Sequence, residues 1–167
     1  LKTYYQQASN NKINITGKVF EPYPSTYTVA DITDSNRPTL LNNAVKYVKQ
    51  QNPTMDWSTY DRNKDGYFDN LHFITNLYMD GIEWSDPLWP HQSALRASGG
   101  TASSPAGNVY EITTFGMFTD ARTVIHEQGH MFGLPDYYDY SYSGADYVGY
   151  LDMQSNNVMD WNSWSKF

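Results

Sequence analysis

The stretch from His126 to Asp136, which has the pattern H-E-x-x-H-x-x-G-x-x-D, constrains the fold of this chain more than any other feature. Four residues of an α-helix advance about 400°, so the side chains of His126 and His130 lie about 40° apart and about 6 Å apart along the axis. Both imidazoles can then reach one metal ion. Gly133 allows a sharp turn after the helix, which can bring Asp136 back to the same ion. The sequence therefore predicts a helix, a tight turn and a returning segment.

The residue types in this stretch favour zinc. Histidine and carboxylate ligands at this spacing are typical of sites that leave the fourth zinc position to water. Glu127 lies about 100° around the helix from His126, off the ligand face but within reach of that water. We therefore expect Zn²⁺ bound by His126, His130 and Asp136, with Glu127 as general base and acid. Asp139 follows in the same loop and competes with Asp136 as third ligand.

Composition excludes several other classes of site and partner. The chain has no Cys, which removes disulfides, Cys-based zinc sites and thiol catalysis. Its net charge of −7 and pI near 4.8 disfavour nucleic acid and anionic membrane surfaces as partners. It contains no apolar run of the roughly 18 residues that a membrane span needs. A chain of 167 residues can bury a core of its own.

Hydrophobic periodicity predicts an α+β set of elements. The clearest helix begins near Asn36, carries Pro38 in its first turn and ends before Pro53. We expect helices over residues 1–9, 36–52 and 120–132, strands over 12–20, 68–79 and 112–115, and a Gly- and Ser-rich surface loop over 97–107. The segment after Gly133 is rich in Tyr, Gly and Asp, shows little periodicity and is expected to be irregular.

A second candidate metal site lies in an acidic turn. Oxygen-bearing side chains occupy positions 1, 3, 5 and 9 of a calcium-loop pattern with Gly at position 6, namely Asp61, Asn63, Asp65 and Asp69. His72 stands at position 12, where such a loop has Glu. Two interpretations stay open: a Ca²⁺ site, or an Asx-rich turn whose carboxylates accept hydrogen bonds from nearby backbone N–H groups.

Residues 126–139, HEQGHMFGLPDYYD, resemble the active-site signature of the immune inhibitor A family of secreted bacterial metallopeptidases, in the metzincin clan. Looser resemblances cover most of the chain: LKTYYQQASNNKINITGKVF, DRNKDGYFDNLHFI, LWPHQSAL and GYLDMQSNNVMDWNSWSK. The resemblance implies a zincin- or metzincin-like catalytic domain, with a twisted mixed sheet, a backing helix, an active-site helix and a small irregular lower lobe. It also implies Asp136 as the third zinc ligand.

The resemblance has further implications for organisation. It implies a single domain over residues 1–167, with an upper lobe over about 1–133, a lower lobe over about 134–167, and a truncated C-terminus. It implies a secreted bacterial protein that is the monomeric catalytic unit of a larger precursor. It also implies a Met-turn beneath the imidazoles, for which we favour Met153 over Met159. Either methionine could instead be ordinary core.

We therefore expect a zinc-dependent endopeptidase that hydrolyses amide bonds of protein or peptide substrates. A non-catalytic, metal-stabilised surface or binding module on the same fold is the alternative, and a metal-dependent hydrolase of another substrate is a third. Glu127 argues against the module, because a structural zinc site needs no base. His91 is either a cleft residue or structural, with the second favoured, and His72 is expected to be packed.

Overall fold

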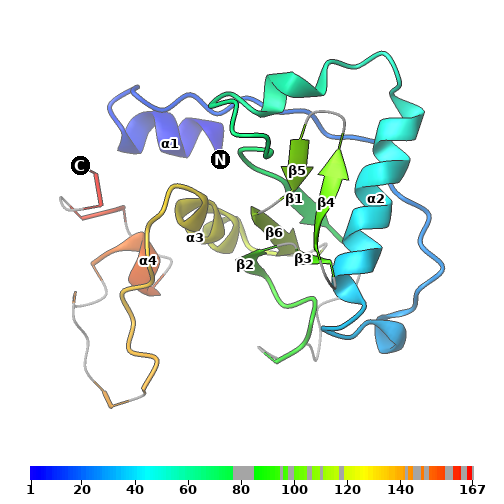
Figure 1. The fold of residues 1–167 in the computed structure, drawn as a ribbon. Helices are drawn as coiled ribbons and strands as arrows, with labels where there is room; N and C mark the ends of the chain where they lie inside the picture. The colour runs from blue at the N-terminus through cyan, green and yellow to red at the C-terminus, as the bar shows by residue number, and fades with distance from the viewer. Residues whose placement is uncertain are drawn as a thin grey trace. The chain divides into compact units, whose positions relative to one another are not determined.

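The computed structural model describes residues 1–76, 85–94, 96–97, 100–104, 107–109, 111–116, 119–141, 143–144, 148, 151–156, 160–162 and 165–166. The chain divides into two compact units (Figure 1). Leu1–Lys18 and Thr119–Phe167 form the terminal unit, and Val19–Phe118 form the central unit. These two units differ from the two lobes that we expected on either side of residue 133. The single-domain organisation stays a prediction. Across the described residues, no helix combines the length and apolar character that crossing a membrane requires.

The central unit contains a three-stranded mixed sheet, which makes the fold α+β as predicted. Its strands, in the order β1-β6-β2, are β1 (His72–Ile74), β6 (Glu111–Phe115) and β2 (His91–Ala94). Strand β6 runs parallel to β1 and antiparallel to β2. The strand predicted over 112–115 is confirmed. The strand predicted over 68–79 is shorter than expected, and residues 77–79 lie outside the described part of the chain.

A second, antiparallel sheet lies where a surface loop was expected. It consists of β3 (Arg96–Ala97), β4 (Gly100–Ser104) and β5 (Gly107–Val109). The loop prediction over 97–107 is therefore wrong. Gly, Ser and Ala have low β-propensity, but ladder hydrogen bonds use only the backbone, so composition does not forbid pairing.

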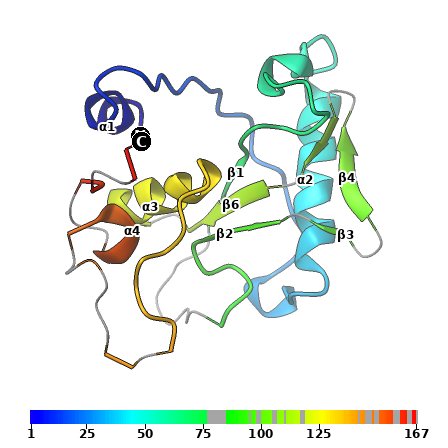
Figure 2. The same ribbon diagram turned by 60° about the vertical axis from the view of Figure 1, so that its left-hand side comes forward.

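Helix α2 (Arg37–Gln51) contributes to the core of the central unit and lies alongside β3 and β4 (Figures 1 and 2). It begins after Asn36, as predicted, with a proline in its first turn, and its buried Leu41 and Val45 pack with Phe68. The 3₁₀ helix η2 (Trp57–Tyr60) adds aromatic side chains to this cluster, and a shorter one, η1 (Val29–Asp31), precedes α2.

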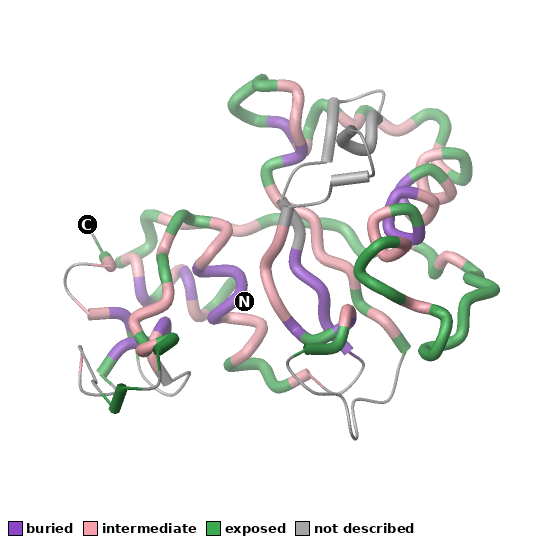
Figure 3. Tube along the Cα trace, turned by 60° about the horizontal axis from the view of Figure 1, so that its bottom comes forward, coloured by how far each residue is buried: buried purple, intermediate pink, exposed green. Residues whose placement is uncertain are grey.

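The terminal unit is built from α1 (Lys2–Ala8), α3 (Ala121–Met131) and the short α4 (Met153–Asn156). Its core comprises Tyr5, Ala8, Met153 and Trp161, so each unit has buried residues of its own (Figure 3). The helices predicted over 1–9 and 120–132 are confirmed. The strand predicted over 12–20 is wrong: Ile13 and Ile15 do pack on this core, but no described strand pairs with them.

Candidate metal centre

The sequence sets the start and the end of helix α3, and so the direction of its histidines. Asp120 precedes the helix in an extended conformation, and its carboxylate accepts from the backbone N–H of Arg122 at 2.7 Å, which caps the first turn. Gly133 has φ of +82°, a conformation that favours glycine. Its N–H bonds to the carbonyl of His130 at 2.8 Å. The chain can therefore reverse within three residues of His130.

This reversal places three metal-ligating atoms close together. His126 Nε2 and His130 Nε2 are 3.1 Å apart. Asp136 Oδ1 lies 2.8 Å from the first and 3.3 Å from the second. Among the described residues, this is the one group of three His, Cys, Asp or Glu whose ligand atoms all lie within 4.8 Å of one another. The group could hold a metal ion.

Hydrogen bonds on the far side of each ring indicate which nitrogen faces the group. His126 Nδ1 lies 3.0 Å from the carbonyl oxygen of Met153, and His130 Nδ1 lies 2.6 Å from that of Leu134. A carbonyl can only accept, so both Nδ1 atoms carry the hydrogen in the neutral rings, and both Nε2 atoms present lone pairs. Asp136 Oδ1 is buried without a hydrogen-bond donor. Three lone-pair donors therefore converge with no hydrogen between them.

The spacing of these atoms fits zinc. A tetrahedral ion with ligands at about 2.0–2.1 Å has neighbouring ligand atoms about 3.3 Å apart. The observed separations of 2.8, 3.1 and 3.3 Å lie at or slightly below that value. Two imidazoles and one carboxylate also leave a coordination position for water or substrate. The residues present therefore fit a metal of this kind.

Protons compete with a metal for the same lone pairs. Burial of both rings opposes protonation, but the Asp136 carboxylate, the carbonyl bonded to each Nδ1 and the Glu127 charge together outweigh it and raise the pKa of His126 and of His130 above 6.5. Burial alone would raise the pKa of Asp136, but the two imidazoles, when protonated, and the hydrogen bond from Tyr140 hold it well below its usual range. Asp136 is therefore ionised at neutral pH. As the pH falls toward the histidine pKa values, a metal ion must displace protons from the two imidazoles, so its affinity should decrease.

Glu127 follows His126 on α3 and is buried. Its negative charge adds to the raised pKa of His126, His130 and Tyr140, so it lies near all three. A carboxylate beside the ligand group, contributed by the same helix but not a member of the group, is suited to accept a proton.

Helix α4 packs against α3 and contacts both histidines. The fully buried Gln154 donates from Nε2 to the His126 carbonyl at 3.2 Å, and that nitrogen lies 3.4 Å from His130 Nδ1. Gly129 permits this approach, since a Cβ there would lie 2.4 Å from Gln154 Oε1. Met153 is buried in the core, and its role as Met-turn stays a prediction. The alternative, Met159, lies outside the described residues.

Asp139, the competing third ligand, does not join the group. Its Oδ1 accepts from the backbone N–H of Ser141 at 2.8 Å, and its Oδ2 accepts from that of Ser143 at 2.6 Å. Both serine hydroxyls also donate to it. These bonds hold the pKa of Asp139 well below its usual range. Asp139 therefore organises the loop after the site, while Asp136 turns toward the histidines.

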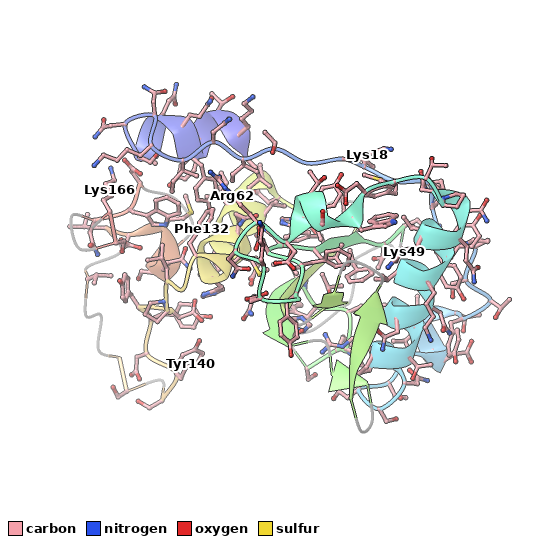
Figure 4. All side chains as sticks on the ribbon, turned by 45° about the horizontal axis from the view of Figure 1, so that its top comes forward. Lys18, Lys49, Arg62, Phe132, Tyr140 and Lys166 are labelled. Atoms are coloured by element: carbon pink, nitrogen blue, oxygen red, sulfur yellow. The ribbon has the colours of Figure 1, made fainter. Side chains whose placement is uncertain are left out.

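The acidic turn of the central unit uses its carboxylates differently. The Asp61 oxygens accept from the backbone N–H groups of Asp65 and Gly66, each at 3.1 Å. Gly66 has φ of +89°, which allows the chain to fold back over Asp61. Asp69 Oδ2 accepts from the backbone N–H of Arg62 at 3.0 Å, on the loop labelled in Figure 4.

The two remaining predicted calcium ligands, Asn63 and Asp65, are also engaged within the turn. Asn63 Oδ1 accepts from the Asp65 N–H at 3.1 Å, and its amide donates to Asp65 Oδ2 at 2.8 Å. Within the described residues, the carboxylates of this turn form no group of ligand atoms like the one at His126. These bonds match the Asx-turn interpretation, and calcium binding stays a prediction.

The other two histidines lie in the central unit. His91 Nε2 contacts the Arg37 guanidinium, and His91 Nδ1 contacts the Trp89 carbonyl. Burial lowers the pKa of His91, and the Arg37 charge adds to this. Its contacts favour the structural interpretation. The ring of His72 packs 5.4 Å from that of Phe115.

Sequence reasoning missed two residues around the histidines, Gln154 and Tyr140. The hydroxyl of Tyr140 donates to Asp136 Oδ2. Gln154 is distant from the ligands in sequence. Tyr140 stands four residues after Asp136, but this spacing has no helical meaning in a segment predicted to be irregular and rich in tyrosine. No local pattern distinguishes these two from their neighbours.

Comparison with known proteins gives a distant relationship. No family model matches the chain. The chain is 25% identical over 191 residues to the Pre-pro-metalloprotease PrtV of Vibrio cholerae serotype O1, in strain M66-2 and in strain ATCC 39315 / El Tor Inaba N16961. The match covers 93% of this chain but 21% of the relatives, so the chain spans about a fifth of their length. The similarity points to a metalloprotease-related region.

Proposed function

We propose that this chain is the catalytic core of a zinc-dependent metalloendopeptidase with a metzincin-like fold, related to the immune inhibitor A family. His126, His130 and Asp136 hold the ion, and Glu127 is the general base and acid. The observation that carries the proposal is the convergence of three lone-pair donors with no hydrogen between them. The distant similarity to a pre-pro-metalloprotease supports the same conclusion independently of geometry.

The chain's own residues divide the chemistry between them. A bound zinc ion would polarise the substrate carbonyl and lower the pKa of water. Glu127 accepts a proton from the attacking water molecule and delivers it to the leaving amide nitrogen, so that the amine departs neutral. The carbonyls of Met153 and Leu134 hold the two imidazoles with Nε2 facing inward. The substrate is a protein or peptide.

The relative's name also supports a proposal about context. A pre-pro protein is a precursor, and this chain matches only part of it. We propose that the chain is one part of a larger bacterial precursor and acts outside the cell.

The test combines metal content with turnover. The zinc-loaded chain should bind about one equivalent of zinc and cleave a fluorescence-quenched peptide library. Glu127→Gln, which keeps the size of the side chain but removes its basicity, should retain zinc and lose about 10²–10⁴-fold in turnover. The matched control is Glu21→Gln, because Glu21 is exposed in the central unit and bonds to Asn52.

Each other outcome has a distinct meaning. A folded wild-type chain that binds no zinc would contradict the metal centre. Zinc binding without cleavage of any peptide would support the non-catalytic module, and cleavage of esters alone would support another hydrolase. Wild-type turnover in a zinc-loaded Glu127→Gln variant would remove Glu127 from the mechanism.

A further inference from the structure

Tyr140 contacts the candidate metal centre in a way that the proposed function does not use. Its hydroxyl donates to Asp136 Oδ2, whereas Asp136 Oδ1 faces the Nε2 atoms of His126 and His130. The two oxygens of one carboxylate therefore have separate partners. Figure 4 shows Tyr140 in the segment that follows α3.

Core packing does not explain the position of Tyr140, since 68% of the residue is exposed. Its described contacts lie on the side of the candidate centre. The ring of Tyr140 meets that of Tyr138 edge-on, with centroids 5.0 Å apart. The ring of Tyr138 is in turn nearly parallel to that of His126, at 6.3 Å and 16°. An exposed side chain held by the site's own residues indicates a role at the site.

The hydrogen bond has a consequence for coordination. A carboxylate can bind a cation through one oxygen or through both. Binding through both oxygens of Asp136, together with His126 and His130, would occupy the fourth position that a hydrolytic zinc site keeps for water. A donor fixed on Oδ2 disfavours that mode, because the hydrogen bond uses one lone pair of Oδ2 and holds the carboxylate with Oδ1 toward the histidines.

We propose that Tyr140 is a positioning residue that fixes Asp136 as a one-oxygen ligand and so keeps the fourth coordination position open. The proposal rests on the proposed metal centre. It adds that the three ligands need a hydrogen bond from Tyr140 to Asp136 Oδ2 to bind the ion in this way. Partners that orient a ligand in this way typically change metal affinity by about 10–100-fold.

The test removes one hydroxyl. Tyr140→Phe keeps the ring and its contact with Tyr138 but deletes the donor to Asp136. The matched control is Tyr137→Phe, since the Tyr137 hydroxyl bonds to Ser165 at 3.1 Å instead. Zinc affinity, measured by competition with a chromophoric chelator, should fall by about 10–100-fold in Tyr140→Phe and by less than about twofold in the control. Thermal unfolding of the metal-free variants should match that of the wild type.

A spectroscopic measurement separates positioning from a general loss of affinity. With Co²⁺ in place of Zn²⁺, the wild type and Tyr137→Phe should show the intense visible bands of a four-coordinate ion. Tyr140→Phe should show shifted bands that added azide no longer changes, whereas azide should change those of the wild type, because the freed Oδ2 then occupies the position that water leaves to an added anion. Unchanged zinc affinity and an unchanged cobalt spectrum in Tyr140→Phe would overturn this proposal while leaving the metal centre intact. A wild type that binds neither ion would overturn the metal centre itself.

Discussion

The acidic turn around Asp61 in the central unit and the stretch from His126 to Asp136 in the terminal unit both carry metal-ligand residue types at a known spacing, but their lone pairs face different partners. In the turn, the Asp61 oxygens accept from backbone N–H groups five residues away or fewer. At α3, the backbone carbonyls of Met153 and Leu134 accept hydrogen bonds from the Nδ1 atoms of the two imidazoles instead. The Nε2 atoms and Asp136 Oδ1 are left facing one another. Spacing therefore selects candidate sites, and the hydrogen bonds around them decide which lone pairs remain for an ion.

The largest expected effect tests which carboxylate belongs to the metal centre. Asp136→Ala should weaken zinc binding by more than about 100-fold, because removing a ligand exceeds the effect of removing a partner that only orients one. Asp139→Ala is the matched control and should bind zinc normally, since Asp139 bonds to Ser141 and Ser143. Chelator competition measures both. Loss of zinc in Asp139→Ala with normal binding in Asp136→Ala would reverse the assignment.

The second prediction concerns the packing of Gln154 against Gly129 of α3, for which the acidic turn has no counterpart among its described contacts. Ala is a better helix former than Gly by about 1 kcal/mol, so Gly129→Ala would stabilise an exposed helix. Here the new Cβ would meet Gln154 Oε1 at 2.4 Å. We expect a loss of about 1–3 kcal/mol in the free energy of unfolding, or roughly 2–4 °C in Tm per kcal/mol.

Gly17→Ala is the control for this change, because its Cβ would meet nothing within 4 Å. Urea unfolding of the metal-free chains compares the two variants. A stabilised Gly129→Ala would mean that Gln154 does not pack against α3 as described.

The third prediction tests whether the acidic turn needs an ion. Asp61→Ala removes the acceptor for two backbone N–H groups in a nearly buried position. It should lower the free energy of unfolding by about 1–2 kcal/mol, by the same amount with and without millimolar Ca²⁺, with zinc kept saturating. Asp34→Ala, at an exposed carboxylate of the same unit, should change it little. A calcium-dependent rise in wild-type Tm that Asp65→Ala abolishes would instead support the calcium site.

The smallest expected effect concerns Lys49, whose buried Nζ atom has no hydrogen-bond partner among the described residues but belongs to no candidate metal site. Lys49 is labelled in Figure 4, and its Nζ lies 5.6 Å from the centre of the Trp57 ring. Burial lowers its pKa from 10.5 to about 8. The unfolded chain then binds more protons than the folded chain between these values, so stability should rise as pH increases from 8 to 10.5.

Lys49→Met keeps the apolar stem of the side chain and removes the titration. It should stabilise the chain by at most about 1 kcal/mol at pH 7, because solvent screens the charge of this partly buried side chain, and it should remove most of that rise with pH. Urea unfolding at several pH values between 7 and 10 measures both. Equal pH dependence in Lys49→Met and the wild type would contradict the assignment to Lys49.

The sequence by itself determined the parts of this protein that depend on short-range geometry. Helical periodicity places His126 and His130 on one face of α3, Asp120 caps its start, and Gly133 supplies the positive φ at its end. The same reasoning located α1, α2 and β6. These features depend on residues within about one helical turn of one another, so local composition carries their signal.

Only the tertiary structure decided how the candidate site is completed. The bond from His126 to Met153 spans 27 residues, and the bond from Gln154 to the His126 carbonyl spans 28. The pairing of β3, β4 and β5 likewise uses the backbone groups of residues that are mostly Gly, Ser, Ala and Asn, which have low β-propensity. Such contacts form only when the chain returns to itself, because hydrogen bonds are satisfied by whichever partners the fold brings within reach, at any separation in sequence.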